Sequence, residues 1–358
     1  MKYFDTIAEM GHEQVVFCHD KASGYRGIIA IHDTTLGPAL GGCRFWNYAS
    51  DEEAVTDALR LSRGMTYKNA VAGLNLGGGK SVIIGNNKTP QREMLFRAHG
   101  RFVDSLGGRY VTAEDVGTTV EDMDFVHMET RHVTGIGSKS GDPSSVTARG
   151  VFRAIQASAF EKWGSKELTG RTVAMQGLGQ VGYYLARELH AAGAKLVVTD
   201  IDAGRIDRVV QEFGATAVAL NDVYGVQADI FAPCALGGTL NDETIPQLKV
   251  QIVAGAANNQ LLEDRHGEEL DSRGILYAPD YVANAGGVIN VYSELTGWSR
   301  DRSLRKADEI YETVLSVFAL ARGTGIPTYK AADRVAEQRI AAVGGMMKTW
   351  PQYPNKDA

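Results

Sequence analysis

The stretch 172–200 constrains the fold of this chain more than any other. It reads TVAMQGLGQVGYYLARELHAAGAKLVVTD: an apolar strand, a glycine turn, an amphipathic helix, a second apolar strand and a terminal acid. In such a unit one glycine takes a tight turn, the next lets backbone approach a pyrophosphate, and the third lets helix pack on strand. It therefore predicts a binding site for a nicotinamide or flavin dinucleotide. The turn residues are Gly177, Gly179, Gln180, Val181 and Gly182.

The acid that ends the second strand favours one form of the cofactor. Asp200 follows the last glycine by roughly 20 residues, where a carboxylate accepts hydrogen bonds from the adenosine ribose hydroxyls. A carboxylate there would repel a 2′-phosphate, so the sequence predicts NAD rather than NADP. Arg205 is near in sequence and leaves use of both open.

Length and composition indicate a cytoplasmic enzyme with two domains. The chain has 358 residues, 44% of them hydrophobic and 22% charged, which is enough for two cores. Its net charge of −6 argues against nucleic acid as a partner, and no stretch approaches the roughly 20 apolar residues that cross a bilayer. The N-terminus is polar and shows no secretory signal. Three cysteines without a C-x-x-C pair argue against disulfides and zinc sites: Cys18, Cys43 and Cys234.

Alternating strands and helices predict an α/β fold with a cleft between two domains. The first domain, 1–140, is expected to hold a mostly parallel sheet, and 141–326 a Rossmann domain. The glycine- and serine-rich segment 135–145 is the predicted crossover, and a C-terminal helix at about 327–350 is expected to return to the first domain. Predicted strands are 24–32, 81–85, 109–112, 229–233, 251–255 and 274–279; predicted helices are 52–64, 90–106, 303–322 and 327–343.

Lys80 is the first candidate for chemistry. Most lysines are solvated surface charges. Lys80, however, follows three glycines and precedes the apolar run SVIIG, so its ammonium is expected to be partly desolvated. Desolvation lowers the pKa of a lysine toward the range useful for proton transfer. The GGGK sequence lacks the spacing of a P-loop, so it does not indicate a phosphate cradle.

A carboxylate is expected beside this lysine. The sequence TAEDVGTT puts Glu114 and Asp115 at the end of a predicted strand, where ligands bind in open α/β sheets. Asp115 could instead cap the helix that begins near Val120, although Thr118 or Thr119 would cap it better. If Asp115 meets Lys80, the pair can move a proton to or from a reacting nitrogen or water.

With these residues in place, the chain resembles the amino acid dehydrogenase superfamily of glutamate, leucine, valine and phenylalanine dehydrogenases, and among them the bacterial leucine dehydrogenases. The resemblance covers about residues 1–342. The matching segments are ALRLSRGMTYKNA, GLNLGGGK, TAEDVGTT, GLGQVG, DIFAPCALGG, AGAANNQ and YAPDYVANAGGVINV.

The resemblance implies oxidative deamination of an L-amino acid to its 2-oxo acid and ammonia, with hydride passing to NAD. It implies that Lys68 binds the substrate carboxylate, that Lys80 activates the attacking water, and that Asp115 exchanges protons with the substrate nitrogen. It also implies a homo-oligomer, commonly an octamer. The same resemblance implies that the backbone of Gly41 lies against the substrate. It also implies that three residues contact the nicotinamide end of the cofactor: Thr147, Asn258 and Asn284.

The side-chain pocket implied by the family is uncharged. Glutamate is therefore disfavoured, because its second carboxylate would be buried without a partner. Ala113 stands where phenylalanine enzymes tend to have glycine, which favours leucine with overlapping activity on valine and isoleucine. Tyr292 and Trp298 keep phenylalanine or tryptophan open as the alternative. The pocket residues are Leu40, Met65, Ala113, Val288 and Val291.

Two other classes of function are weighed against this one. A non-catalytic dinucleotide sensor would not need Lys80 and Asp115, and both are present. A hydroxy-acid dehydrogenase would need a histidine paired with a carboxylate. His32 and His99 lie in apolar strand or helix contexts that indicate packing or surface positions. No metal is expected, because three further histidines lack the spacing of metal ligands: His127, His132 and His190.

Overall fold

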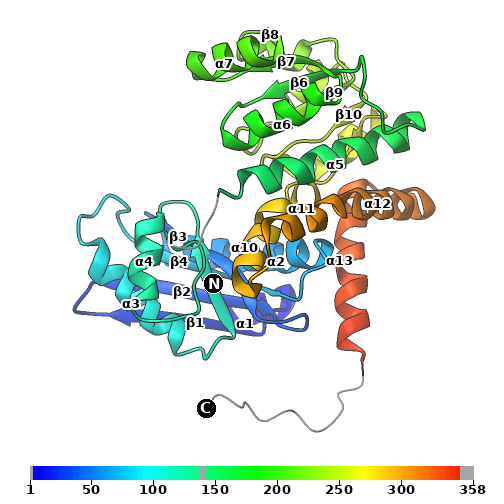
Figure 1. Ribbon diagram of the computed structural model, residues 1–358. Coiled ribbons are helices and arrows are strands. Elements are labelled where there is room, and N and C mark those ends of the chain that lie inside the picture. The colour runs from blue at the N-terminus through cyan, green and yellow to red at the C-terminus, as the bar shows by residue number, and fades with distance from the viewer. Residues whose placement is uncertain (1–2, 138–141, 347–358) are drawn as a thin grey trace.

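The computed structural model describes residues 3–137 and 142–346. It contains two β-sheets, each covered by helices, as Figure 1 shows. The expected α/β class and its two-sheet plan are confirmed. The boundary expected at 140/141 and the middle of the predicted crossover lie outside the described residues.

The first sheet has the strand order β1-β2-β4-β3-β5. It is mixed where a mostly parallel sheet was expected: β2 runs antiparallel to β1 and β4, whereas β4, β3 and β5 are mutually parallel. The antiparallel pairing of β1 with β2 has a local cause, because the turn that joins them at 21–24 is too short for a parallel crossover. The strands are β1 Gln14–Asp20, β2 Tyr25–Asp33, β3 Ala39–Trp46, β4 Gly77–Ile84 and β5 Tyr110–Glu114; β1 and β3 were not predicted.

Helix α2 (Asp51–Val71) lies on one face of this sheet, with α1 (Tyr3–Met10) beside it. The other face is covered by α3 (Arg92–Asp104) and α4 (Val120–His127). Helix α2 starts at a Ser50 cap, and α4 starts at Thr119 in a capping box with Asp122, so Asp115 is not its cap.

The glycine run belongs to strand β4, which starts four residues before the predicted strand, at Gly77 rather than Ser81. A Cβ on Gly78 would lie 2.1 Å from the backbone nitrogen of Thr66 in α2, and one on Gly79 would lie 2.6 Å from the ring of Tyr110. Gly78 therefore lets α2 pack directly on the strand that carries Lys80, and Gly79 makes room for the Tyr110 ring.

The second sheet is parallel throughout, in the order β11-β10-β9-β6-β7-β8. The order turns back between β6 and β9, which is where ligands bind in such sheets. Its strands are β6 Thr172–Gln176, β7 Lys195–Thr199, β8 Thr216–Ala217, β9 Ile230–Pro233, β10 Ile252–Val253 and β11 Leu276–Tyr277. Its helices are α5 Ser144–Trp163, α6 Gln180–Ala191, α7 Ala203–Phe213 and α8 Arg265–Ser272, with short 3-10 turns at Asp222–Gly225 and Ile245–Gln247.

The C-terminal helices join the two halves. Helix α13 runs from α12 down to the first half in Figure 1, and Arg339 on α13 donates to the carbonyls of Ala70 and Leu74 at the end of α2, at 3.1 and 2.7 Å. The helix predicted at about 327–350 is observed over Thr328–Gly344, and residues 347–350 lie outside the described part. No helix of the described residues has the length and apolar character needed to cross a bilayer. The helices are α9 Asp280–Ala283, α10 Gly286–Thr296, α11 Arg300–Asp308, α12 Ile310–Thr324 and α13 Thr328–Gly344.

We predict that Arg339→Ala lowers the free energy of unfolding by about 1–3 kcal/mol, because the carbonyls at the end of α2 lose a charged donor. Urea denaturation measures the change. Arg334→Ala, an exposed position on the same helix, is the control and should shift stability by less than about 0.5 kcal/mol. Equal effects of the two variants would show that α13 does not hold α2 through Arg339.

Candidate active site

The centre of the site is an ion pair between Lys80 on β4 and Asp115 just after β5. Lys80 is only 4% exposed, and its Nζ lies 2.8 Å from Oδ2 of Asp115. The two strands flank β3, and the pair reaches across Gly42. A Cβ on Gly42 would lie 2.8 Å from Cβ of Asp115, so this glycine keeps the space through which the carboxylate meets the amine.

A second cation shares the same carboxylate oxygen. Nε of Arg44 donates to Oδ2 of Asp115 at 3.0 Å. Strand register explains the contact: Cys43 pairs with Glu114, so the next residues along β3 and the chain after β5 are neighbours. The sequence analysis missed both Arg44 and Gly42. The available signal was a charged residue within the segment ALGGCRFW.

Burial and charge act in opposite directions on this pair. Burial lowers the pKa of Lys80, and Asp115 restores part of the loss. Burial alone would raise the pKa of Asp115, but Lys80 and Arg44 together outweigh it and hold that pKa below its usual value. Asp115 is thus an anion at neutral pH, next to an amine that releases its proton more readily than a solvated lysine.

Lys68 on α2 connects this centre to the second half of the chain. Its Nζ donates to Oδ1 of Asn284 at 2.7 Å and approaches Oδ1 of Asn258 at 3.4 Å. Burial lowers the pKa of Lys68 to about 8, with Asp280 opposing the shift and Lys80 adding to it. The two asparagines come from the loop after β10 and from the end of α9.

The glycine turn follows β6 and leads into α6. A Cβ on Gly182 would lie 2.1 Å from the carbonyl oxygen of Gly177, whose φ is +97°, so both positions need glycine. Gly179 is the N-cap of α6, which begins with Gln180 and Val181, and the nearest side-chain atom to its Cβ position is 4.0 Å away, on Arg205. The open backbone there, at a helix N-terminus, fits a pyrophosphate.

Asp200 lies at the same turn. Its Oδ2 accepts the Leu178 N–H at 2.6 Å and its Oδ1 accepts the Asp202 N–H at 2.9 Å, while Arg205 approaches Oδ1 at 3.8 Å. The Asp200 carboxylate is therefore held in place by two backbone N–H groups at the glycine turn. A nucleotide would bind next to a carboxylate whose position is already set.

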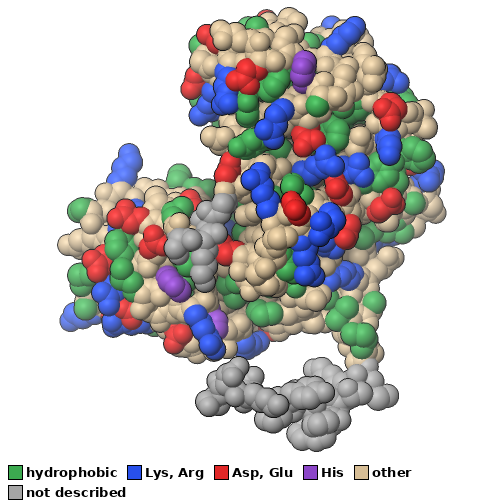
Figure 2. All heavy atoms as spheres, viewed as in Figure 1, with side chains coloured by type: hydrophobic (Ala, Val, Ile, Leu, Met, Phe, Trp, Pro, Cys, Tyr) green, Lys and Arg blue, Asp and Glu red, His purple; other side chains and the backbone are tan. Residues whose placement is uncertain are grey.

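An open pocket of about 470 Å³ adjoins Asp115. Ala113 and Asp115 line it from the first half, and Val291 and Glu294 line it from α10. Glu294 was not expected here; its carboxylate accepts the Gly135 N–H at 3.2 Å and so bridges the two halves. In Figure 2 the surface is indented between the two halves of the molecule.

The other residues predicted for the substrate and nicotinamide sites do not line this open pocket. Leu40 and Val288 are buried in one apolar cluster that joins the two halves, and Met65 packs against it, so these three do not line the open pocket. Gly41 accepts a hydrogen bond from Tyr110 at 2.6 Å through its carbonyl. Thr147 on α5 lies against α10, where a Cβ on Gly287 would be 3.3 Å from its hydroxyl.

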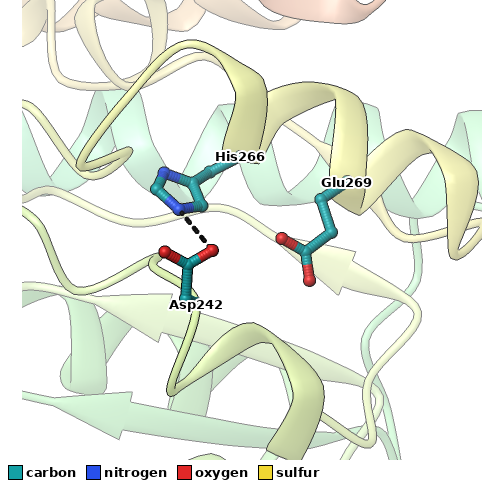
Figure 3. A group of neighbouring side chains, drawn as sticks. All are labelled: Asp242, His266 and Glu269. Carbon is teal, nitrogen blue, oxygen red and sulfur yellow. Dashed lines mark ion pairs between the residues drawn. The ribbon is translucent and has the colours of Figure 1, made fainter.

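A separate group of metal-ligand types lies on the second half, at Asp242, His266 and Glu269 (Figure 3). Nε2 of His266 is 3.4 Å from Oδ1 of Asp242. Arg265, however, donates to both oxygens of Asp242 at 2.6 Å and holds the pKa of that carboxyl at about 2. The Arg265 guanidinium already neutralises this carboxylate. We therefore infer that the three side chains stabilise the structure around the start of α8 and do not bind a metal.

Comparison with known proteins places these features in a known family. Residues 12–132 match the Glu/Leu/Phe/Val dehydrogenase dimerisation domain, and residues 137–209 and 200–343 match the glutamate/leucine/phenylalanine/valine dehydrogenase domain. The leucine dehydrogenase of Geobacillus stearothermophilus is 60% identical over 95% of this chain and 94% of its own. The L-tryptophan dehydrogenase of Nostoc punctiforme is 51% identical over 95% and 97%. Its crystal structure superposes with a TM-score of 0.88 over 95% and 99% of the chains, at 49% identity.

We predict that two glycines of the turn respond differently to alanine. Gly182→Ala should cost about 1–3 kcal/mol of stability, because its methyl group would overlap the Gly177 carbonyl. Gly179→Ala should cost less than about 1 kcal/mol but weaken dinucleotide binding, because the methyl stands where phosphate approaches. Thermal unfolding and fluorescence titration with NADH measure the two effects, and the reverse pattern would contradict this assignment of the turn.

Proposed function

From the membership of this chain in the glutamate/leucine/phenylalanine/valine dehydrogenase family, which makes it an amino acid dehydrogenase, we propose its reaction. It catalyses the NAD-dependent, reversible oxidative deamination of L-leucine. The products are the 2-oxo acid, ammonia and NADH. Valine and isoleucine would be further substrates, because one methyl or methylene changes discrimination by only about 1–3 kcal/mol. The observation that carries the proposal is the Lys80–Asp115 ion pair, with Lys68 beside it, in a site that both halves complete.

The residues of the glycine turn fit a nicotinamide dinucleotide, and Asp200 favours NAD over NADP. When bound, this cofactor accepts the hydride that leaves the substrate Cα. We propose that Asn258, Asn284 and Thr147 hold its nicotinamide end near Lys68.

Each charged side chain has a task that follows from its surroundings. The ammonium of Lys68 binds the substrate carboxylate, and the carboxylate in turn stabilises the protonated amine against its low pKa. Lys80, in its neutral form, takes a proton from the water that attacks the imine carbon. Asp115 receives and returns protons at the substrate nitrogen, and the backbone of Gly41 lies against the substrate.

Substrate choice rests on the apolar residues around this centre. Ala113 and Val291 line the pocket, and the cluster that holds Leu40, Met65 and Val288 is apolar as well. None of these five residues carries charge, so the second carboxylate of glutamate would lack a partner. One observation favours tryptophan as a second candidate: Glu294 places a hydrogen-bond acceptor in the pocket beside Ala113 and Val291, which an indole N–H could use. The family's dimerisation domain supports a homo-oligomer, for which we propose an octamer in the cytoplasm.

An NADH-formation assay with single amino acids tests the proposal. We expect the highest kcat/KM for leucine, values for valine and isoleucine within about 10–200-fold of it, no turnover of glutamate, and weaker use of NADP than of NAD. Tryptophan as the best substrate would replace leucine by the second candidate. No turnover of any amino acid would end the proposal.

We predict that Lys80→Ala lowers kcat by at least about 10²–10⁴-fold, the usual contribution of a positioned base, while NADH affinity stays within about twofold. Fluorescence titration measures the NADH affinity, and initial-rate assays measure kcat. Lys21→Ala, at an exposed turn of the same half, is the control and should match the wild type in both. A kcat of Lys80→Ala near that of the wild type would refute the role of Lys80.

A further inference from the structure

The two oxygens of the Asp115 carboxylate are not equivalent. Lys80 and Arg44 both bind Oδ2, at 2.8 and 3.0 Å. Oδ1 makes no hydrogen bond with any residue in the described part of the chain, and the Asp115 side chain is 24% exposed beside the open pocket. One oxygen is thus held by two cations, and the other has no hydrogen-bond partner among the described residues.

Arg44 is itself held from behind. Its Nη1 donates to both carboxylate oxygens of Asp57 on α2, at 3.2 and 2.9 Å, and the hydroxyl of Tyr48 donates to Oδ2 of Asp57 at 2.6 Å. Tyr48 lies between β3 and α2, so three consecutive parts of the chain fix the guanidinium. The arrangement forms a continuous chain of hydrogen bonds from Tyr48 through Asp57 and Arg44 to Asp115.

The planar guanidinium is suited to this position. It presents Nε to one carboxylate and Nη1 to another at once, in a fixed geometry that a lysine ammonium does not reproduce. Arg44, Tyr48 and Asp57 line a second open pocket, of about 510 Å³, which is distinct from the pocket next to Ala113. Arg44 therefore lines a pocket other than the one that Asp115 shares with Ala113.

We propose that Arg44 is a positioning residue for the deamination: it fixes Asp115 through Oδ2 so that Oδ1 meets the substrate nitrogen, and it limits how firmly Asp115 holds the proton on Lys80. This inference rests on the proposed function, because it assigns Arg44 a task through Lys80 and Asp115.

The direction of the electrostatic effect follows from the charges. Arg44 repels the protonated Lys80 and so lowers the pKa of that amine, in addition to the larger effect of burial. It also helps Lys80 to keep the pKa of Asp115 low. Removing the guanidinium charge should raise both. The other ionisable groups that act on this trio are Cys43, Tyr48, Asp57, Lys68, Tyr110 and Glu114.

The expected kinetic consequence is specific. If neutral Lys80 is the working base, kcat/KM rises with pH as the amine loses its proton. In Arg44→Gln the rise should move to higher pH, and kcat at its optimum should fall about 10–100-fold because Asp115 is misplaced. KM for leucine should change by less than about threefold, since Lys68 and not Arg44 binds the substrate carboxylate.

Three further variants separate this role from a structural one. Arg44→Lys keeps the charge but cannot bind Asp57 and Asp115 together, so it should restore the wild-type pH profile while kcat stays low. Asp57→Asn leaves Arg44 in place with a weaker support and should give a smaller loss of kcat. Arg26→Gln, which removes an exposed pair with Asp51 in the same half, is the control and should match the wild type.

Full pH profiles of kcat and kcat/KM, with thermal unfolding of each variant, decide the matter. Two outcomes overturn the inference. In the first, the pH profile of Arg44→Gln superimposes on that of the wild type. In the second, Arg44→Gln loses kcat but its profile shows no shift to higher pH that Arg44→Lys reverses. If Arg44→Gln does not fold, Asp57→Asn decides alone, and an unchanged kcat there overturns it. Wild-type protein without activity on any amino acid would instead refute the proposed function.

Discussion

The ion pair between Lys80 and Asp115 depends on a missing side chain. The lysine and the carboxylate come from the two strands that flank β3, and they meet over Gly42, where a Cβ would lie 2.5 Å from the Glu114 carbonyl and 2.8 Å from Asp115. Gly78 makes a second close contact possible, between β4 and α2, the helix that carries Lys68. Backbone packing that only glycine allows therefore sets the position of all three charged groups.

The same packing explains why a buried lysine is stable there. A lone buried ammonium would be costly, and the structure meets part of that cost with Asp115 and leaves the rest as a lowered pKa. Lys68 differs from Lys80, because its hydrogen-bond partners in the described structure are neutral amides rather than a carboxylate. An incoming substrate carboxylate thus finds one amine paired with an acid and one without a bound counter-ion.

Local patterns were readable in the sequence, and contacts between distant segments were not. The stretch 172–200 carries its strand, turn and helix signals in consecutive residues, and the family resemblance drawn from such motifs is confirmed. Strand β3 was missed because two glycines interrupt its apolar pattern. The position of Arg44 depends on the pairing of Cys43 with Glu114, 71 residues apart, and the antiparallel pairing of β2 with β4 likewise joins segments that are distant in sequence. The roles of Lys68, Lys80 and Asp115 stay predictions that kinetics must test.

The contacts between the halves indicate how substrate binding would reorganise the site. Asn284 accepts from Lys68 through Oδ1 and donates through Nδ2 to the Ala256 carbonyl at 3.1 Å and to Asn258 at 2.9 Å. A substrate carboxylate that takes the Lys68 ammonium frees Oδ1 of Asn284, while the Nδ2 bonds still hold the side chain in place. The freed oxygen is then an unused acceptor where the two halves meet, so that one exchange of partners at Lys68 changes both sides of the site.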